Sequence, residues 1–328
     1  NTSVGWNSMC KNTTGEFNTA TGARSLQCNT TGGENVSSGY NSLAVNSTGC
    51  KNVAFGKSSL EANTTADNNT AVGFSSLKAN TTGAQNTAVG RCALASNTTA
   101  SSNTAVGYNS SHCNTTGTNN TSVGCISLNK NTTGSNNTAI GRSALACNTT
   151  AADNVAVGYL SLNINTTGTQ NVAVGTNSLD TATTGNCNTA VGHGVMGENT
   201  TGSNNTAVGR TALFSNTTAS NNVAIGHSAL LANTTGTQNV AIGMSALATN
   251  STADKNTVVG TCAAYATQST GHSNSVLGNE ALKCNTTGCY NIAIGCHSLF
   301  DSTTGKFNIA ISRALINNTT GGSNTSIG

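Results

Sequence analysis

The 328-residue sequence contains no proline, and only 7% of its residues are charged and 4% aromatic. Without proline, every residue can donate a backbone N–H, which suits a structure built of hydrogen-bonded ladders. The charged fraction lies far below the roughly 25% of typical soluble domains. Disordered chains combine high net charge with few β-branched residues. Here the formal net charge is +3 and Thr, Val and Ile are abundant, so the composition favours an ordered, uncharged structure.

Several classes of function lack their usual signals. No apolar run approaches the roughly 20 residues of a membrane-spanning helix, and no secretion signal is visible at the start. The small net charge gives no electrostatic case for nucleic acid. The acidic residues are scattered along the chain, and no Ser-His-Asp spacing, C-x-x-C pair or paired carboxylates occur. The histidines are also scattered: His112, His193, His227, His272 and His297. The sequence therefore predicts no enzyme, no metal site and no cofactor.

The dominant feature is a 17-residue repeat, N-[TV]-A-[VI]-G-x-x-[SA]-L-x-x-N-T-T-G-x-x, whose positions are numbered 1 to 17 here. Clear copies run from Asn69 to Gln85, from Asn137 to Asp153 and from Asn205 to Asn221. Nineteen full copies and a final fragment are present, and position 1 is Asn in all twenty. One copy has an extra residue near Gln268, and another lacks one near Ser312. A repeat of this length predicts a solenoid.

The residues within the repeat specify one coil of such a solenoid. The segment T-A-V has the period and the β-branched residues of a short strand. Gly at position 5 permits a bend with positive φ, S-A-L begins a second short segment, and N-T-T-G turns the chain back. We expect Val or Ile at position 4, Leu at position 9 and sometimes Val at position 2 to fill the core. One repeat buries too little alone, so the copies must stack.

The sequence thus predicts an all-β fold, a β-solenoid (β-roll or β-helix) of about 19 turns with parallel strand pairing. It forms a single continuous domain over residues 1–328 that spans about 90 Å at about 4.8 Å per turn. A helical array is the alternative, but Gly, Asn and Thr recur in every repeat and are poor helix formers. The chain starts and ends within the repeat without a polar cap. We therefore expect either head-to-tail polymerisation or a longer rod, since uncapped ends expose strand edges.

The N-[TV]-A-[VI]-G segment resembles the head repeats of trimeric autotransporter adhesins, which carry a similar S-V-A-I-G strand. The whole unit resembles the N-T-A-I-G-x-x-A-L-x-x-N-T-T-G repeats of bacterial surface proteins and phage tail fibres, and this resemblance covers the full chain. It implies a β-roll and a surface, adhesive or fibre role. The adhesin repeat is shorter, so the cross-section should differ, and the bacterial repeats are usually poor in cysteine whereas this chain has 12.

Position 12 begins an N-x-[ST] sequon in sixteen of the nineteen full copies. In a secreted eukaryotic protein such a turn can carry a glycan. The predicted glycosylation sites are Asn12, Asn29, Asn46, Asn63, Asn80, Asn97, Asn114, Asn131, Asn148, Asn165, Asn199, Asn216, Asn233, Asn250, Asn285 and Asn318. The alternative is a sugar-free ladder of stacked Asn and Thr side chains. Ala182, Gln268 and Ser302 replace the Asn in three copies while the Thr that follows is kept, which favours a structural part for the threonines.

At position 1, the Asn is interpreted as a turn residue in an internal amide ladder.

The 12 cysteines suggest disulfide bridges between neighbouring turns. Three pairs each join position 6 or 7 of one turn to position 11 of the next, and two weaker pairs complete the set. The predicted bridges are Cys92–Cys113, Cys125–Cys147, Cys262–Cys284, Cys10–Cys28 and Cys289–Cys296. Cys50 and Cys187 remain free or link to other chains. A cytosolic location would instead leave all 12 as thiols.

These observations favour a structural fibre or filament subunit outside the cell or on its surface. Its partners would be further copies of itself, bound head to tail or side by side, and covalent glycans. One alternative is the shaft of an adhesin or tail fibre. A second is an ice-binding solenoid, which requires a regular, sugar-free row of threonines.

Overall fold

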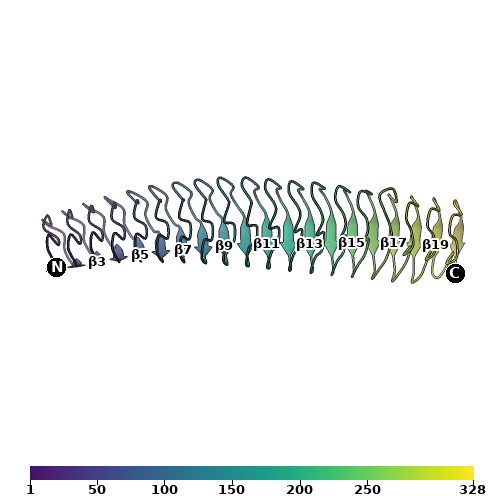
Figure 1. Cartoon of the computed structure of the whole chain (residues 1–328), viewed down its shortest axis with the longest axis horizontal. Helices are drawn as coiled ribbons and strands as arrows, with labels where there is room; N and C mark the ends of the chain where they lie inside the picture. Colours follow the sequence, from purple (N-terminus) through teal and green to yellow (C-terminus); the bar gives the residue numbers. More distant parts are fainter. The chain divides into compact units, whose positions relative to one another are not determined.

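The computed structural model describes residues 1–328 in two compact units, Asn1–Thr167 and Gly168–Gly328. The fold class predicted from the sequence is confirmed: the chain is a parallel β-solenoid of about 19 turns, each about 17 residues long, with no helix (Figure 1). Each turn contributes one strand of three residues, at repeat positions 2 to 4. Consequently no helix of the structure could cross a membrane. The single continuous domain stays a prediction.

The strands recur at nearly constant intervals. In the first unit they are β1 (Thr2–Val4), β2 (Thr19–Thr21), β3 (Val36–Ser38), β4 (Val53–Phe55), β5 (Thr70–Val72), β6 (Thr87–Val89), β7 (Thr104–Val106), β8 (Thr121–Val123), β9 (Thr138–Ile140) and β10 (Val155–Val157). In the second they are β11 (Val172–Val174), β12 (Thr189–Val191), β13 (Thr206–Val208), β14 (Val223–Ile225), β15 (Val240–Ile242), β16 (Thr257–Val259), β17 (Ser275–Leu277), β18 (Ile292–Ile294), β19 (Ile309–Ile311) and β20 (Thr325–Ile327).

Within each unit, consecutive strands pair in parallel and equal repeat positions stand opposite each other, as Thr87 does opposite Thr104. The irregular copies keep this register. The extra residue of the copy that starts at Asn256 lies in its loop, so Thr257 still pairs with Ser275. Thr267, rather than Gln268, takes the buried position 12 of that copy. Likewise, Ile309 pairs with Thr325 across the copy that lacks a residue. Insertions and deletions therefore change loops and leave the strands in place.

Hydrogen bonds join neighbouring turns around the whole coil as well as at the strands. In the loop after β2, for example, Leu26 N–H donates to the Ser42 carbonyl of the next turn at 3.0 Å. The backbone reaches this path through left-handed residues at positions 7, 9 and 17, such as Arg24, Leu26 and Glu34 with φ of 57°, 52° and 60°. Only the glycine bend at position 5 follows from the sequence. There, Gly90 has a φ of 132°, and an added Cβ would lie 2.5 Å from the Gly107 carbonyl oxygen.

The core is narrower than the sequence suggests. Position 9 is buried as predicted: Leu26, Leu43 and Leu60 are 0% exposed. The inward residue of each strand, however, is the small residue at position 3, such as Ala71 at 0%. Positions 2 and 4 point outward, and Phe55 is 43% exposed. The expected core role of positions 2 and 4 was therefore wrong, because alternation along a strand sends both to the face opposite position 3. The second segment, S-A-L, forms turns and no strand.

The asparagines at positions 1 and 12 hold the interior of each coil together. Asn86 (position 1) and Asn97 (position 12) both donate from Nδ2 to the carbonyl of Ala100 at 2.9 Å. Each also reaches the preceding turn: Asn97 Nδ2 donates to Asn80 Oδ1 at 2.8 Å, and Asn86 N–H donates to Asn69 Oδ1 at 2.9 Å. The internal amide ladder predicted for position 1 is thus confirmed. Position 12 forms a second ladder beside it.

Replacing one member of this second ladder should weaken its turn strongly. Asn97→Ala removes the donor to Asn80 Oδ1 and to the Ala100 carbonyl, and it removes the acceptor of Asn114 Nδ2. We expect a loss of about 2–3 kcal/mol of local stability, because buried polar groups lose their partners. Amide hydrogen exchange over residues 86–119 measures it. The control is Thr99→Ala, at an exposed position of the same turn, which should change stability by less than about 0.5 kcal/mol. Equal protection in the two variants would contradict the structural role of the ladder.

Candidate functional site

The sequons at position 12 do not lie on an exposed turn. Of the sixteen predicted glycosylation sites, fourteen are 0% exposed, and only Asn12 and Asn318, in the first and last full copies, are partly exposed. The Nδ2 of Asn131 donates to Asn114 Oδ1 at 2.7 Å and to the Gly134 carbonyl at 2.8 Å, as in the other turns. A glycan would replace one of these protons and needs a path to solvent. The folded turn therefore has no room for the predicted glycans at the fourteen buried asparagines.

The threonines that follow have different surroundings. At position 13 the hydroxyl donates to the position 13 carbonyl of the next turn, as Thr81 Oγ1 does to Thr98 at 3.0 Å. At position 14 the side chain is exposed, as in Thr82 and Thr99. Position 13 therefore forms the sugar-free threonine ladder, whereas the threonine at position 14 is exposed to solvent.

Other sequons are open to solvent, and four of them share one repeat position. Asn68, Asn119, Asn136 and Asn204 occupy position 17 and are exposed. Their side chains make only exposed contacts, such as that of Asn136 Nδ2 with Asp153 Oδ1 at 3.0 Å. The turn at this position can accept a bulky group without disturbing either amide ladder.

The predicted disulfides are not formed: all 12 cysteines are free thiols. This correction applies to Cys92–Cys113, Cys125–Cys147, Cys262–Cys284, Cys10–Cys28 and Cys289–Cys296. The reason lies in the register of the loops. Position 7 faces position 10 of the next turn, as the 3.3 Å contact of Asn41 with Glu61 shows, and position 11 lies one residue further on. Cys289, at position 16, is buried and donates to the Thr270 carbonyl at 2.9 Å.

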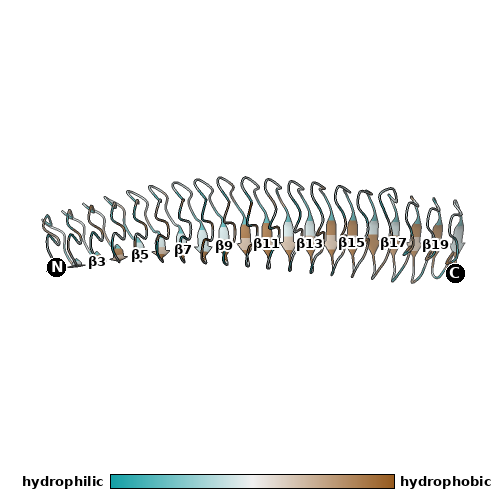
Figure 2. Cartoon of the chain, in the orientation of Figure 1, coloured by the Kyte–Doolittle hydropathy of each residue, from teal (hydrophilic) through white to brown (hydrophobic).

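The outward face of the strands carries no charge. Of the two outward residues in each of the twenty strands, none is Asp, Glu, Lys or Arg. Position 2 is mostly Thr or Val, and position 4 is mostly Val or Ile; Ile140, Ile225 and Leu277 are 39%, 38% and 52% exposed. Figure 2 shows several of the strands in the brown of apolar residues, whereas the loops are mostly white to teal. We call the residues at positions 2 and 4 the outward strand face.

Charged residues are confined to positions 6, 7, 10, 11, 16 and 17. In the first unit these positions form two edges that flank the ends of the strands. The edge at positions 6, 7, 10 and 11 holds seven cations and one carboxylate, Glu61. The edge at positions 16 and 17 holds four carboxylates and one cation, Lys51. The first is called the basic edge below. One turn of this unit therefore presents an uncharged face and two edges of opposite charge.

The second unit contains one cluster of interacting ionisable groups. Glu280 accepts hydrogen bonds from Lys283 Nζ at 2.8 Å and interacts with His297 Nε2 at 3.1 Å. The Lys283 hydrogen bond holds the pKa of Glu280 below its usual value, with a smaller contribution from His297, and the same bond raises the pKa of Lys283. Burial, together with the nearby Asp301, raises the pKa of the Cys284 thiol. Glu280 and His297 both stand at position 7, so the repeat alignment contained the signal for this pair.

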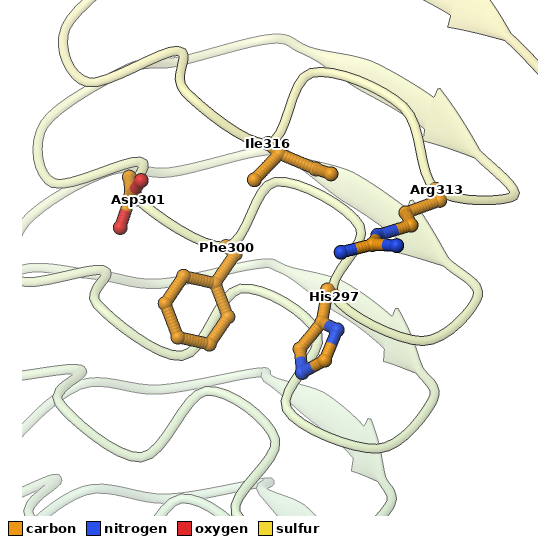
Figure 3. A pocket seen from close by; sticks show the side chains of 5 residues that line it. All are labelled: His297, Phe300, Asp301, Arg313 and Ile316. Carbon is orange, nitrogen blue, oxygen red and sulfur yellow. The ribbon is translucent and has the colours of Figure 1, made fainter.

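A pocket of about 270 Å³ lies beside this cluster, lined by His297, Phe300, Asp301, Arg313 and Ile316 (Figure 3). The His297 ring packs edge-on against Phe300 at 5.2 Å, and the Cys296 thiol lies 3.7 Å from His297 Nδ1. In the first unit, His112 Nδ1 lies 3.2 Å from the Cys92 carbonyl of the preceding turn. No group of three or more His, Cys, Asp or Glu side chains is placed to hold a metal ion. Within the cluster, the Glu280–His297 contact joins successive turns, whereas the Lys283–Glu280 ion pair lies within one turn.

No protein-family model, no curated protein and no solved structure matches the chain. The family of this repeat is therefore not identified beyond the 17-residue β-solenoid itself.

Glycan occupancy should follow exposure rather than the sequon count. When folded protein is isolated from a eukaryotic secretory pathway, we expect glycans at Asn68, Asn119, Asn136 or Asn204 and none at the buried position 12. Enzymatic deglycosylation followed by peptide mass spectrometry measures this, because each released site is converted from Asn to Asp. Conversion at Asn97 or Asn131 in folded material would contradict the buried ladder.

Proposed function

We propose that this chain is the structural subunit of a fibre and that copies associate side by side through the outward strand face. The observation that carries the proposal is the complete absence of charge from this face in twenty successive strands. Charged residues occur on both edges in the first unit, whereas the strand face between them carries none. Position 14 is also exposed and uncharged, but its side chains are threonines rather than the Val or Ile of position 4. Regular apolar surface that remains exposed on a soluble chain marks an interaction site.

The size of the face suits a second copy of the same chain. Ten strands at about 4.8 Å spacing give a strip about 48 Å long in each unit. With a width of about 10 Å, two such strips would bury about 1,000 Å² in total for each unit, near the lower limit for a specific interface. Because every turn repeats the same outward residues, the contact can continue along as many turns as both copies provide.

The location and the wider role of the fibre rest on the sequence. The resemblance to repeats of surface and tail-fibre proteins and the four exposed sequons at position 17 support an extracellular or cell-surface fibre. The shaft of an adhesin or tail fibre is compatible with the same lateral contact. We therefore treat that alternative as a variant of the structural role.

One feature favours ice binding as a second candidate. In β5 to β9, five successive turns carry Thr at position 2 and Val or Ile at position 4. This gives a regular row of threonines, Thr70, Thr87, Thr104, Thr121 and Thr138, at a spacing of about 4.8 Å. The side chains lie on a face without charge. Their regular hydroxyl and methyl groups could order water in the way that an ice-binding surface requires. Thr70, Thr121 and Thr138 also complete the exposed sequons of Asn68, Asn119 and Asn136, so ice binding requires that these sites carry no glycan.

Lateral association should be lost when charge is added to the outward strand face. The triple variant Val72→Lys, Val106→Lys and Ile140→Lys places three charges on alternate turns, where they do not oppose each other directly. We expect the dissociation constant to rise at least about tenfold, because each lysine must be desolvated on association. Sedimentation velocity and electron microscopy measure the change.

The matched control introduces the same three charges in the same turns at exposed position 14: Thr82→Lys, Thr116→Lys and Thr150→Lys. It should associate like the original chain. Circular dichroism checks that both variants keep their β structure. A chain that stays monomeric at all accessible concentrations, or a face variant that associates normally, would refute the proposal.

Thermal hysteresis tests the second candidate. The original chain should depress the freezing point below the melting point of ice, and Thr104→Lys should reduce this gap because it breaks the threonine row. Thr116→Lys, in the same turn but at position 14, should leave the gap unchanged. Absence of hysteresis in the original chain would remove ice binding.

A further inference from the structure

The basic edge of the first unit carries an ordered series of rings and cations. Over the first seven turns, aromatic and cationic side chains alternate: Trp6, Arg24, Tyr40, Lys57, Phe74, Arg91 and Tyr108. All stand at position 6 except Arg24, at position 7. We call these seven residues the aromatic–cation ladder. The ladder gives no signal along the linear sequence, because the alternation appears only when position 6 is followed from turn to turn.

Cation–π contacts join Trp6 to Arg24 and continue turn by turn from Tyr40 to Tyr108. The Arg24 guanidinium lies 5.2 Å from the Trp6 ring, and Lys57 Nζ lies 5.9 Å from both the Tyr40 and the Phe74 rings. Distances below about 6 Å are those of cation–π pairs. These contacts fix the direction of the long cationic side chains. The ladder is therefore arranged before any partner arrives, which lowers the entropic cost of binding.

The rings nevertheless remain open to solvent. Trp6 is 64% exposed, and Tyr40, Phe74 and Tyr108 are 46%, 46% and 45% exposed. Packing between turns does not require such large exposed rings, because small side chains such as Ala23 also occur at position 6. Exposed aromatic side chains with a polar group within reach are typical of binding surfaces.

We propose that the aromatic–cation ladder binds a linear acidic polysaccharide whose repeating unit is a disaccharide with one carboxylate or sulfate. The rings recur every second turn, about 9.6 Å apart, which is close to the length of an extended disaccharide. The apolar faces of sugar rings stack on aromatic rings, and the intervening cation pairs with the acidic group of each repeat.

The charge around the ladder supports an anionic partner. The basic edge holds seven cations against one carboxylate, and that carboxylate, Glu61, lies 3.9 Å from Lys78 Nζ. A long polyanion would be attracted along the whole edge and would bind more weakly as salt rises. The outward strand face takes no part in this contact, so the inference is independent of lateral association.

Binding is measured by isothermal titration of the full chain with hyaluronan oligosaccharides, which alternate a uronate with an uncharged amino sugar. Inorganic polyphosphate serves as an anion without rings, dextran as a neutral polysaccharide, and single-stranded DNA as a polyanion with flat rings. We expect hyaluronan to bind at least about tenfold more tightly than polyphosphate of equal charge, which corresponds to about 1.4 kcal/mol. Dextran should not bind measurably.

Two double variants distinguish the contribution of the aromatic rings to binding from that of the cations. Tyr40→Ala with Phe74→Ala should weaken hyaluronan binding at least about tenfold while the polyphosphate affinity stays constant. Lys57→Gln with Arg91→Gln should weaken both and reduce the salt dependence. Phe74→Leu keeps the bulk of the side chain but not its flat ring, so it reports on stacking in a turn that remains packed. Phe17→Ala and Lys51→Gln, at position 17, are the matched controls and should bind normally.

Three results would overturn the proposal. Equal affinity for polyphosphate, with no effect of ring removal, would make the edge a simple ion-exchange surface. Tighter, ring-dependent binding of DNA would assign the ladder to nucleic acid. No binding of any polyanion would limit the ladder to packing between turns. The outward-face lysine variant separates the two proposals, because it should bind hyaluronan like the original chain even when lateral association is lost.

Discussion

The structure depends on the need to satisfy amide groups that are buried inside each coil and have no contact with solvent. Most turns bury two asparagines, and both donate to one carbonyl at position 15, as Asn137 and Asn148 do to Ala151 at 2.9 and 3.0 Å. Unsatisfied, each buried amide would cost several kcal/mol. The side-chain Oδ1 atoms of these asparagines accept hydrogen bonds from the neighbouring turn, as Asn131 Oδ1 does from Asn148 Nδ2. A single coil therefore cannot exist alone, and stacking is enforced by polar as well as apolar groups.

The fold class could be read from the sequence because the period, the T-A-V strand and the glycine bend are local signals. Which strand residues face the core and which face solvent was predicted less well. Ala71 and Val72 are neighbours in a three-residue strand, and hydrophobicity alone favours Val for the core. The structure selects Ala because the opposite wall carries Leu77 in a confined space. Left-handed residues such as Leu77, with φ of 50°, have no sequence signal, because a branched side chain is unfavourable there and only burial offsets the strain.

The candidate sites were predicted less well for a related reason. A sequon reports the order of residues but not the direction of the side chain, so Asn97 and Asn68 look alike in the sequence although the first is buried and the second exposed. The cysteine pairs failed because adjacent loops are offset, so that position 7 meets position 10. The aromatic–cation ladder and the Glu280–His297 pair become visible only once equal positions are known to be neighbours. The cysteine contacts, the ladder and the Glu280–His297 pair therefore all depend on the register between turns, which the sequence alone does not give.

The turns that gain or lose a residue point to how such a chain can evolve. Strand register survives both changes, at Thr257–Ser275 and at Ile309–Thr325. Unequal recombination between tandem gene copies removes or adds whole turns, and each new junction restores the same hydrogen bonds. Length can thus vary between descendants without the redesign of a core. Single substitutions at positions 6 and 7 can then rewrite the surface one turn at a time, so a lineage can alter what the molecule touches while its scaffold stays constant.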